Sequence, residues 1–349
     1  MPVVSDAGIW VLLTISGLIR TGVTSLANTL LFEVKGVGAT YAGTAIGLTN
    51  NPNTTAYRLV HNEGDSLPGL IVDIYGNIAV LQAHTTGMHD VRQILAEAIV
   101  AASGGNITSV YDKSSDAIRK MTGRKVEDGF LVGTAGECEV LENGYHFHIN
   151  VVTGQKTGFF LDQRENRELL AQHAGGRTVL NMFGYTGGFS VYAAAAGAKV
   201  VHTVDSSAPA IAIAEENMKL NGFKSAKYAC FTADVRKYID SMETGKYDLI
   251  VLDPPAYAKN IASRNQALKG YRTINALALE KIKSGGILFT FSCSQVVDRQ
   301  MFTSAVTAAA VDAGRQVRII RHLSQPPDHP VNIFHQEGEY LKGLVLFVD

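Results

Sequence analysis

The sequence predicts an α/β protein in which a small α+β domain precedes a mostly parallel, seven-stranded sheet with helices on both faces. From about residue 151, short apolar runs alternate with segments of helical spacing, which is the pattern of a parallel sheet. Before that point, short strands and a tight turn accompany one amphipathic helix, which is typical of a smaller mixed unit. At 349 residues the chain also exceeds one ordinary core, so more than one domain is expected.

The predicted domain boundaries follow changes in this pattern. Residues 1–50 carry few charges and no long helical period, and they receive no assignment. A turn cluster at residues 50–53 separates them from the small α+β domain, which is predicted over residues 51–150. Within it, strands are predicted at residues 69–75 and 78–83 around a hairpin turn, with a helix over residues 91–102. Two further short strands are predicted at residues 109–111 and 145–149.

The larger domain is predicted over residues 151–349. Its parallel strands are expected at residues 178–181, 199–205, 226–232, 247–253 and 286–291. Strands at residues 315–321 and 343–347 are expected to join the sheet antiparallel. The helix after Asp205 is well marked, because Ser206 or Ser207 can cap it, Pro209 suits its first turn and Gly222 follows its end.

Composition excludes several classes of protein. Hydrophobic residues make up 46% and charged residues 18%, as in globular domains. The three cysteines form no close pair, so a disulfide framework and a zinc site are not expected and a reducing cytoplasm fits best. The apolar run at residues 8–19 is too short to span a bilayer, so no membrane is expected. No metal is expected either, because His146 and His148 make only two ligands and are predicted to be structural.

A glycine-rich turn after the first parallel strand indicates a cofactor site. Gly184, Gly187 and Gly188 permit a close backbone approach, and ligands of open α/β sheets bind beyond the carboxyl ends of strands. The spacing G-x-x-G-G departs from the dinucleotide fingerprint and favours a nucleoside that carries an amino acid. Asp205 ends the next strand and Asp234 follows a third, where carboxylates can bond ribose hydroxyls and an adenine amino group. The alternative is that the glycines only form a turn and that both aspartates cap helices.

Two other strand ends supply a carboxylate and a thiol. Asp253, Pro254, Pro255 and Tyr257 follow one apolar run, and Cys293 lies between two serines after another. A thiolate that adds to carbon 6 of a pyrimidine activates carbon 5 for methylation, while a carboxylate can hold the base and an aromatic ring can stack on it. The alternatives are that Cys293 is a buried small residue and that Tyr257 is a solvent-edge aromatic.

The remaining cysteines and the basic residues have simpler predicted roles. Cys138 and Cys230 are predicted to be buried structural residues. The net charge of -1 gives no global basic signature, so any contact with nucleic acid must use a local patch. One basic cluster follows the Asp253 loop, where a phosphate backbone would lie, and comprises Lys259, Arg264, Lys269 and Arg272. A second cluster is predicted to be a solvated helix face and comprises Lys113, Arg119, Lys120, Arg124 and Lys125.

Several motifs together resemble one enzyme family. They occupy residues 57–60, 64–70, 153–164, 181–189, 253–255, 292–294 and 328–330. With these motifs the chain resembles, from about residue 55 to its C-terminus, the bacterial large-subunit ribosomal RNA 5-methylcytosine methyltransferases that use one catalytic cysteine. The run Lys156 to Arg164 is the most specific of the motifs.

The resemblance implies a Rossmann-like class I methyltransferase domain, S-adenosyl-L-methionine as the cofactor, and Cys293 as the nucleophile with Asp253 beside it. The resemblance implies cofactor contacts at Phe160, Asp162 and Gln163. The other predicted cofactor contacts are Asn181, Phe183, Gly184, Tyr185, Thr186, Gly187, Asp205, Ser206, Asp234 and Asp253. The predicted substrate contacts are Pro254, Pro255, Tyr257, Lys259 and Arg272.

The expected partner is ribosomal RNA, with the domain at residues 51–150 as the RNA-substrate domain. Such proteins usually begin with an RNA-binding domain of the PUA type, which residues 1–50 do not match, so this segment is interpreted as a degenerate remnant. Four alternatives stay open: a uracil carbon-5 enzyme, an exocyclic-amino methyltransferase, a non-catalytic RNA-binding factor and a small-molecule methyltransferase. The modified nucleotide, the base that removes the carbon-5 proton, and a monomer or homodimer are likewise left open.

Overall fold

The chain folds into two units and passes between them three times. The computed structural model describes residues 46–49 and 51–349. The first unit runs to Leu161 and includes Pro326–Gly338, and the second comprises Asp162–Gln325 and Glu339–Asp349. The segment 1–50 falls outside the described residues except for helix α3 (Ile46–Thr49). The domain boundaries and the PUA interpretation from the sequence stay predictions.

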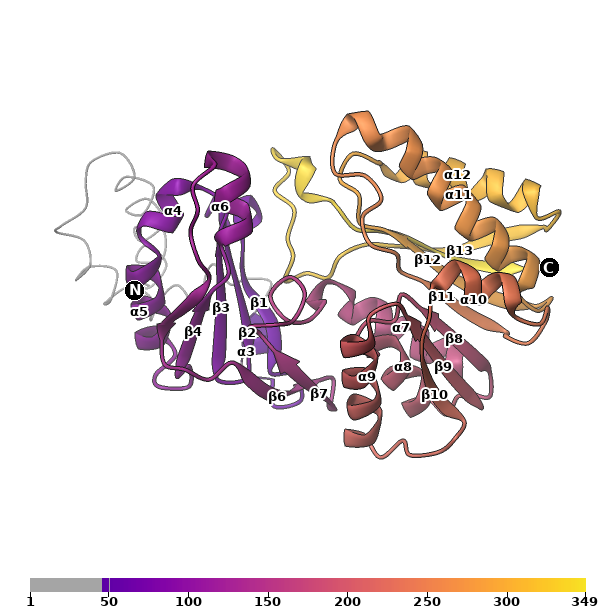
Figure 1. Cartoon of the computed structure of the whole chain (residues 1–349), viewed down its shortest axis with the longest axis horizontal. Coiled ribbons are helices and arrows are strands. Elements are labelled where there is room, and N and C mark those ends of the chain that lie inside the picture. The colour runs from indigo at the N-terminus through magenta and orange to yellow at the C-terminus, as the bar shows by residue number, and fades with distance from the viewer. Residues whose placement is uncertain (1–45, 50) are drawn as a thin grey trace, which may run out of the picture. The chain divides into compact units, whose positions relative to one another are not determined.

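The first unit is built on a five-stranded sheet of order β1-β2-β3-β4-β5 (Figure 1). The strands are β1 (Ala56–His61), β2 (Leu70–Tyr75), β3 (Ile78–Ala83), β4 (Ser109–Asp112) and β5 (Gly129–Val132). Strands β3 and β4 run parallel, and the other neighbours run antiparallel. The β2–β3 hairpin predicted from the sequence is confirmed, since Tyr75 pairs with Ile78 across the turn at Gly76 and Asn77.

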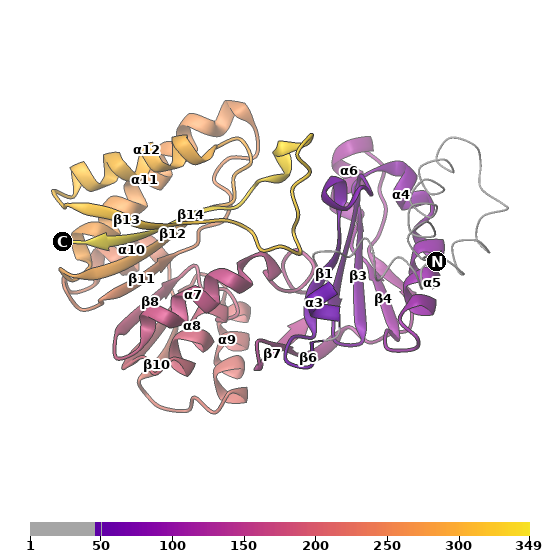
Figure 2. The same ribbon diagram turned by 180° about the vertical axis from the view of Figure 1, so that it is seen from behind.

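Helices and a separate hairpin complete the first unit. The elements are η1 (Asn62–Asp65), α4 (Thr86–Asp90), α5 (Arg92–Ala102), α6 (Ser115–Thr122), β6 (Glu137–Glu142) and β7 (Tyr145–Asn150). Helix α5 packs on β3, β4 and β5, which is visible from behind in Figure 2. Its buried residues Leu95 and Ala96 belong to the apolar cluster that the sheet contributes on this face. The helical spacing read from the sequence therefore corresponds to a real packing face.

The late segment of the first unit is tied to its first strand. The Arg58 amide donates to Asp328 Oδ2 at 3.1 Å, and Asn332 Nδ2 donates to the Glu63 carbonyl at 3.1 Å. Gly64 is required here, because a Cβ at this position would lie 2.1 Å from the Pro330 carbonyl oxygen. The Asp328-His329-Pro330 motif, to which the sequence assigned no role, therefore closes the first unit.

The second unit contains a seven-stranded sheet of order β10-β9-β8-β11-β12-β14-β13. The strands are β8 (Thr178–Met182), β9 (Val200–Asp205), β10 (Tyr228–Thr232), β11 (Leu249–Leu252), β12 (Gly286–Ser292), β13 (Val317–Leu323) and β14 (Lys342–Val348). The first five run parallel to one another. Strand β14 joins antiparallel to β12, and β13 pairs antiparallel with β14, so β13 runs in the same direction as the first five. The predicted fold class is confirmed. Of the two strands predicted to join antiparallel, β14 does so, whereas for β13 the prediction was wrong, because pairing with the reversed β14 turns β13 back to the direction of the parallel strands. The strand order reverses direction between β8 and β11, which makes this the switch point of the sheet.

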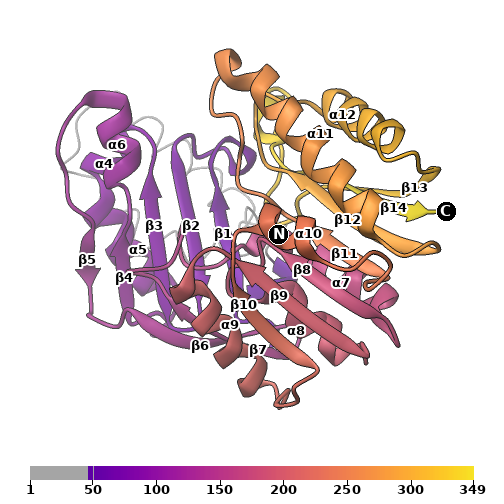
Figure 3. The ribbon, with the colours of Figure 1, turned by 45° about the vertical axis from the view of Figure 1, so that its right-hand side comes forward.

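Helices cover both faces of this sheet (Figure 3). They are α7 (Arg164–Ala174), α8 (Gly188–Ala195), α9 (Ala208–Leu220), α10 (Val235–Ser241), α11 (Arg264–Lys281) and α12 (Arg299–Asp312). The short helices are η2 (Leu161–Gln163), η3 (Ile261–Ser263) and η4 (Gln336–Gly338), of which η4 belongs to the first unit. Helices α7, α8 and α9 lie on one face, and α10, α11 and α12 lie on the other, where they enclose a large apolar core. Ser207 caps α9, as one of the two predicted alternatives, by accepting from the Ala210 amide at 3.3 Å.

None of the helices in residues 46–49 and 51–349 is long and apolar enough to cross a membrane. No group of three or more His, Cys, Asp and Glu side chains in the same residues is arranged to hold a metal ion.

Candidate active site

The candidate residues of the second unit gather at the carboxyl ends of adjacent parallel strands. In the register of the sheet, Leu252 of β11 lies opposite Met182 of β8 on one side and Thr290 of β12 on the other. The residues that follow these strands therefore leave the sheet at the same edge, beside the switch point. This brings the glycine turn, the Asp253 loop and Cys293 to neighbouring positions, as expected for a ligand site in an open α/β sheet.

The turn after β8 has a strained backbone. Phe183 and Tyr185 have positive φ angles of 56° and 45°, a conformation that costs about 1–3 kcal/mol for a residue with a side chain. Gly184 lies between them, and a Cβ there would stand 2.5 Å from Thr203 Cγ2. Gly187 has a φ angle of 81° and begins α8. Strain of this kind persists where the surrounding structure imposes it, often at a binding site.

Asp205 joins this turn to the next strand. Its carboxylate accepts from the Tyr185 amide at 3.0 Å through Oδ2 and from the Ser207 amide at 2.9 Å through Oδ1. The helix cap of α9 is Ser207, so Asp205 is not simply a cap. The bonds fix the orientation of a half-buried carboxylate beside the glycine turn, with exposed Ser206 next to it.

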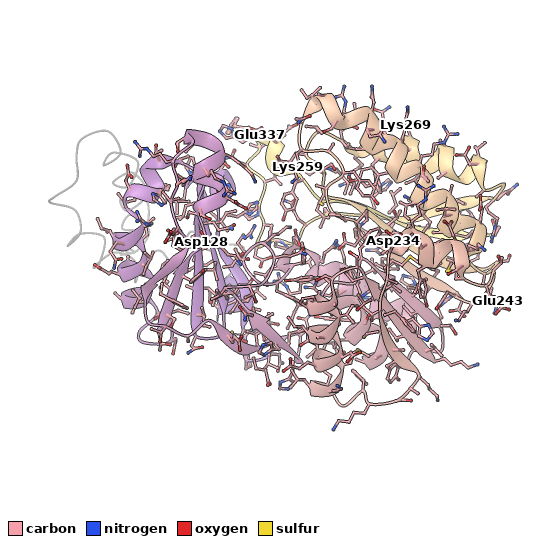
Figure 4. All side chains as sticks on the ribbon, in the orientation of Figure 1. Asp128, Asp234, Glu243, Lys259, Lys269 and Glu337 are labelled. Carbon is pink, nitrogen blue, oxygen red and sulfur yellow. The ribbon has the colours of Figure 1, made fainter. Side chains whose placement is uncertain are left out.

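Asp234, in contrast, does cap a helix. It is the N-cap of α10, where its Oδ1 accepts from the Lys237 amide at 2.9 Å. The side chain is exposed at the end of the loop that follows β10 (Figure 4). The alternative interpretation from the sequence thus describes one real function of this residue, and its predicted cofactor contact stays a prediction.

Two buried polar atoms beside the glycine turn lack a hydrogen-bond partner among the described residues. They are Asn181 Oδ1, at the end of β8, and Thr186 Oγ1, in the turn itself. Asn181 is oriented by its amide, which donates to Ser190 Oγ at 2.9 Å. Buried polar atoms normally have partners, so such atoms need an explanation, and a bound polar ligand is one that fits this position.

Asp253 is held by a chain of amide groups from the start of α7. Gln163 Nε2 donates to Asp253 Oδ2 at 3.0 Å, and Asn166 Nδ2 donates to Gln163 Oε1 at 2.6 Å. Asp162, the neighbour of Gln163, accepts from the Tyr340 hydroxyl at 2.8 Å. These residues are buried apart from Asp253 and Tyr340, which are half-buried. The motif around Gln163 is therefore in contact with the strand-end carboxylate, about ninety residues away in sequence.

Phe160 belongs to the first unit, where the Lys156 ammonium lies 4.5 Å from the centre of its ring. Its expected role at the cofactor remains a prediction.

Cys293 lies immediately after β12, half-buried, with its Sγ 3.8 Å from the Pro254 carbonyl oxygen. The serines on either side are fully buried and hold the loop. Ser294 Oγ accepts from the Ala258 amide at 3.2 Å and is 2.9 Å from the Tyr271 hydroxyl of α11. The thiol is therefore positioned against the backbone of the Asp-Pro-Pro loop, and the flanking serines explain why the motif has that composition.

The two other cysteines have a different environment. Burial raises the pKa of Cys138 to about 11, and burial also raises the pKa of Cys230. Neither thiol follows the carboxyl end of a parallel strand. Both features fit their predicted structural roles, since a reactive cysteine needs access to its thiolate form.

The predicted substrate residues divide into two groups. Pro254 is buried and Pro255 is exposed. The centre of the Tyr257 ring lies 4.8 Å from the centre of the Tyr271 ring, and burial raises the pKa of Tyr257 to about 12. Lys259 is exposed on the segment after β11, and Lys269 is exposed on α11 (Figure 4).

Arg272 differs because its guanidinium already forms two hydrogen bonds of 2.6 Å with Asp312 of α12. A phosphate would have to compete with this carboxylate.

Sequence reasoning missed four residues that the site uses: Asn166, Tyr271, Tyr340 and Lys342. Lys342 is buried, and its Nζ donates to the Ser294 carbonyl at 2.9 Å. The available signal was a lysine that opens an otherwise apolar strand. No comparable signal marks the other three, because their partners are distant in sequence.

Comparison with known proteins identifies the family. Residues 117–339 match the family model described as S-adenosylmethionine-dependent methyltransferase. The chain belongs to this family. The chain is 40% identical over 304 residues to "Ribosomal RNA large subunit methyltransferase I" of Shewanella denitrificans, which covers 85% of this chain and 76% of that relative. It is 41% identical over 305 residues to the protein of the same name from Aeromonas hydrophila, covering 86% and 76%.

Solved structures support the fold of this methyltransferase. A Streptococcus mutans chain described as an S-adenosylmethionine-dependent methyltransferase has a TM-score of 0.78 at 23% identity, covering 94% of this chain and 83% of that chain. A related methyltransferase structure, solved as a complex with SAH, has a TM-score of 0.79 at 24% identity. At this level of identity the likeness establishes the fold alone.

The residues of this methyltransferase fit the donor that defines its family. S-adenosylmethionine carries an amino acid, a ribose and an adenine, and each needs polar contacts. The unpartnered Asn181 Oδ1 and Thr186 Oγ1, together with the oriented Asp205 carboxylate, provide polar atoms beside the glycine turn. The fit rests on the chemistry of these atoms.

Proposed function

We propose that this methyltransferase methylates carbon 5 of a cytosine in large-subunit ribosomal RNA through a covalent adduct with Cys293. The observation that carries the proposal is the position of Cys293, whose thiol lies 3.8 Å from the Pro254 carbonyl, directly after Asp253. The names of the relatives that are 40% and 41% identical support ribosomal RNA as the substrate. A cytoplasmic location is part of the same proposal.

The donor site would use residues around the glycine turn. Asp205 would accept from ribose hydroxyls, and Asn181 and Thr186 would bond polar groups of the donor. Gln163 would act on the site by holding the Asp253 carboxylate. When bound, S-adenosylmethionine supplies an electrophilic methyl group. The predicted contacts of Phe183, Gly184, Gly187, Ser206, Asp234 and Phe160 belong to the same proposal.

The chain's own chemistry begins at Cys293. Its thiolate adds to carbon 6 of the base, and the electron pair of the carbon 5–carbon 6 double bond then makes carbon 5 nucleophilic. Asp253 accepts a hydrogen bond from the cytosine amino group and orients the ring. Loss of the carbon-5 proton re-forms the double bond and expels the thiolate. Because cysteine adds before methyl transfer, the reaction needs a thiol that is accessible and ionisable.

The first unit is proposed to contact the RNA. The support is a set of exposed basic side chains at and after the end of α6, namely Arg119, Lys120, Arg124 and Lys125. Lys113, from the same predicted cluster, has a structural role, because its Nζ donates to the Val151 and Gly154 carbonyls at 2.7 and 2.6 Å. Phosphate contacts by the exposed members would add affinity that is independent of base sequence.

The test is transfer of labelled methyl from S-adenosylmethionine to large-subunit ribosomal RNA, followed by digestion to nucleosides. The wild type is compared with Cys293→Ala and with two matched controls, Cys138→Ala and Cys230→Ala. Label in 5-methylcytosine that only Cys293→Ala abolishes is the expected result.

Other outcomes would assign the protein differently. Label in 5-methyluridine would move the target to uracil, and label in an N-methylated base that survives Cys293→Ala would establish amino-group chemistry. Absence of label on ribosomal RNA in every variant, with the donor still bound, would contradict the proposed substrate.

A further inference from the structure

Lys342 occupies an unusual position for a lysine. It opens β14, and in the antiparallel register with β12 it lies opposite Ser292, one residue before Cys293. Its side chain is buried, with 2% of the residue exposed. Its Nζ donates to the carbonyl of Ser294, one residue after Cys293, at 2.9 Å. The lysine is thus fixed to the residues on both sides of the thiol.

No carboxylate neutralises this lysine within the described part of the chain. Glu339 and Asp298, the two acids whose charges raise the pKa of Lys342, have other partners. Glu339 accepts from Arg299 Nη2 at 2.8 Å, and Asp298 accepts from the Met301 amide at 2.7 Å as the cap of α12. Arg299 adds positive charge to the same surroundings.

Lys342 and Cys293 influence each other electrostatically. Burial lowers the pKa of Lys342 to about 8, and the negative form of Cys293 is the largest influence that opposes this effect. A buried ammonium without a counter-ion is costly, and so is a thiolate in an apolar site. Placing the two beside each other reduces both costs.

We propose that Lys342 is the cationic partner of the Cys293 thiolate: its ammonium group stabilises the anionic sulfur and keeps it available for attack on the pyrimidine ring. The thiol S–H bond breaks, its electron pair stays on sulfur and the proton passes to water, while the ammonium keeps its protons. The same charge stabilises the thiolate when it is expelled at the end of the reaction. Lys342 acts through Cys293 and is therefore a positioning residue.

The inference deepens the proposed function and rests on Cys293 being the nucleophile. Its test needs no methyl transfer, so the two can fail separately. The reaction of each cysteine with iodoacetamide is followed from pH 5 to pH 10 by peptide mass spectrometry. The wild type is compared with Lys342→Met, which keeps the length of the side chain without its charge, and with Lys342→Arg, which keeps the charge.

In the wild type, the alkylation midpoint of Cys293 is expected below about 8.5, the value of a free thiol. In Lys342→Met it is expected to rise by about 1–3 pH units, the effect of removing an opposite charge nearby. Lys342→Arg is expected to restore part of the shift. Cys138 and Cys230 report on the fold of the same molecules, and their profiles should not change.

Two results would overturn the inference. The first is a wild-type midpoint for Cys293 at or above that of a free thiol, which needs no variant and applies even if Lys342→Met fails to fold. The second is an unchanged Cys293 profile in a Lys342→Met protein whose Cys138 and Cys230 profiles and circular dichroism match the wild type. Loss of 5-methylcytosine formation in Cys293→Ala tests the proposed function itself, whatever the alkylation profiles are.

Discussion

The Gly184→Ala substitution tests whether the geometry of the turn after β8 determines donor binding. The new methyl carbon would stand 2.5 Å from Thr203 Cγ2 and 3.0 Å from Asn181 Nδ2. Two carbon atoms prefer a separation of about 3.5–4.0 Å, so the turn must move by about 1 Å. Overpacking of this kind costs about 1–3 kcal/mol.

If the turn moves to relieve the contact, the oriented Asp205 carboxylate and the Thr186 hydroxyl move with it. If the substitution destabilises the bound conformation by about 1–3 kcal/mol, the affinity for the donor falls by about 5- to 150-fold. Isothermal titration with S-adenosylhomocysteine measures this directly. Gly129→Ala is the matched control, because no atom lies within 4 Å of a Cβ at that position, and its affinity should not change.

A second substitution makes the argument specific. Thr203→Ser deletes the methyl group that would clash but keeps the hydroxyl, which lies 2.6 Å from Ser190 Oγ. In the double variant Gly184→Ala/Thr203→Ser, affinity is expected to recover relative to Gly184→Ala. Wild-type affinity in Gly184→Ala, or a folded double variant that recovers nothing, would refute the reasoning.

Three further predictions concern the first unit. Arg58→Met removes the two hydrogen bonds of 2.7 and 2.8 Å that the buried Asp73 carboxylate accepts from Arg58 and leaves only the one from Thr157. It should therefore destabilise this unit by about 3–5 kcal/mol in urea, whereas Arg318→Met at an exposed ion pair should cost about 0–1 kcal/mol. Burial raises the pKa of Asp65 from 3.8 to about 6, so the folded state binds its proton more tightly and stability from this group is lost as pH rises from 4 to 6. Asp65→Asn should therefore gain stability relative to the wild type over that range, and a constant difference in unfolding free energy from pH 4 to pH 7 would contradict the assignment. Replacing the exposed Lys120, Arg124 and Lys125 by alanine should reduce the slope of log K against log salt for binding to ribosomal RNA by about 2–3, as measured by filter binding. An unchanged slope would exclude phosphate contacts by these three residues.

Local patterns were sufficient to predict the fold class and the strands that carry the site. Apolar runs of strand length, ended by Asp205 or followed by Asp253, mark the carboxyl ends of a parallel sheet without any long-range information. The capping serine of α9 was predictable for the same reason, since a helix cap depends on residues three positions apart.

Residues that act through distant partners were not predictable. Lys342 meets the Cys293 loop only because β14 pairs antiparallel with β12, about fifty residues away, and no local pattern specifies that register. The Asn166–Gln163–Asp253 chain likewise depends on the start of α7 meeting the end of β11. For Asp234 the sequence allowed both a cap and a ligand contact, because a carboxylate at this position suits both.

The late segment of the first unit has a consequence for how the protein is made. A ribosome produces residues up to Leu161 long before Pro326–Gly338, yet Asp328 and Asn332 supply bonds to Arg58 and Glu63. At 5–20 residues per second, the early part waits roughly 10–30 s for these partners. During that interval Arg58 lacks the Asp328 carboxylate that accepts from its backbone amide. The early part of this unit therefore reaches its finished state only after residues 326–338 have been made, whereas domains usually fold as they emerge.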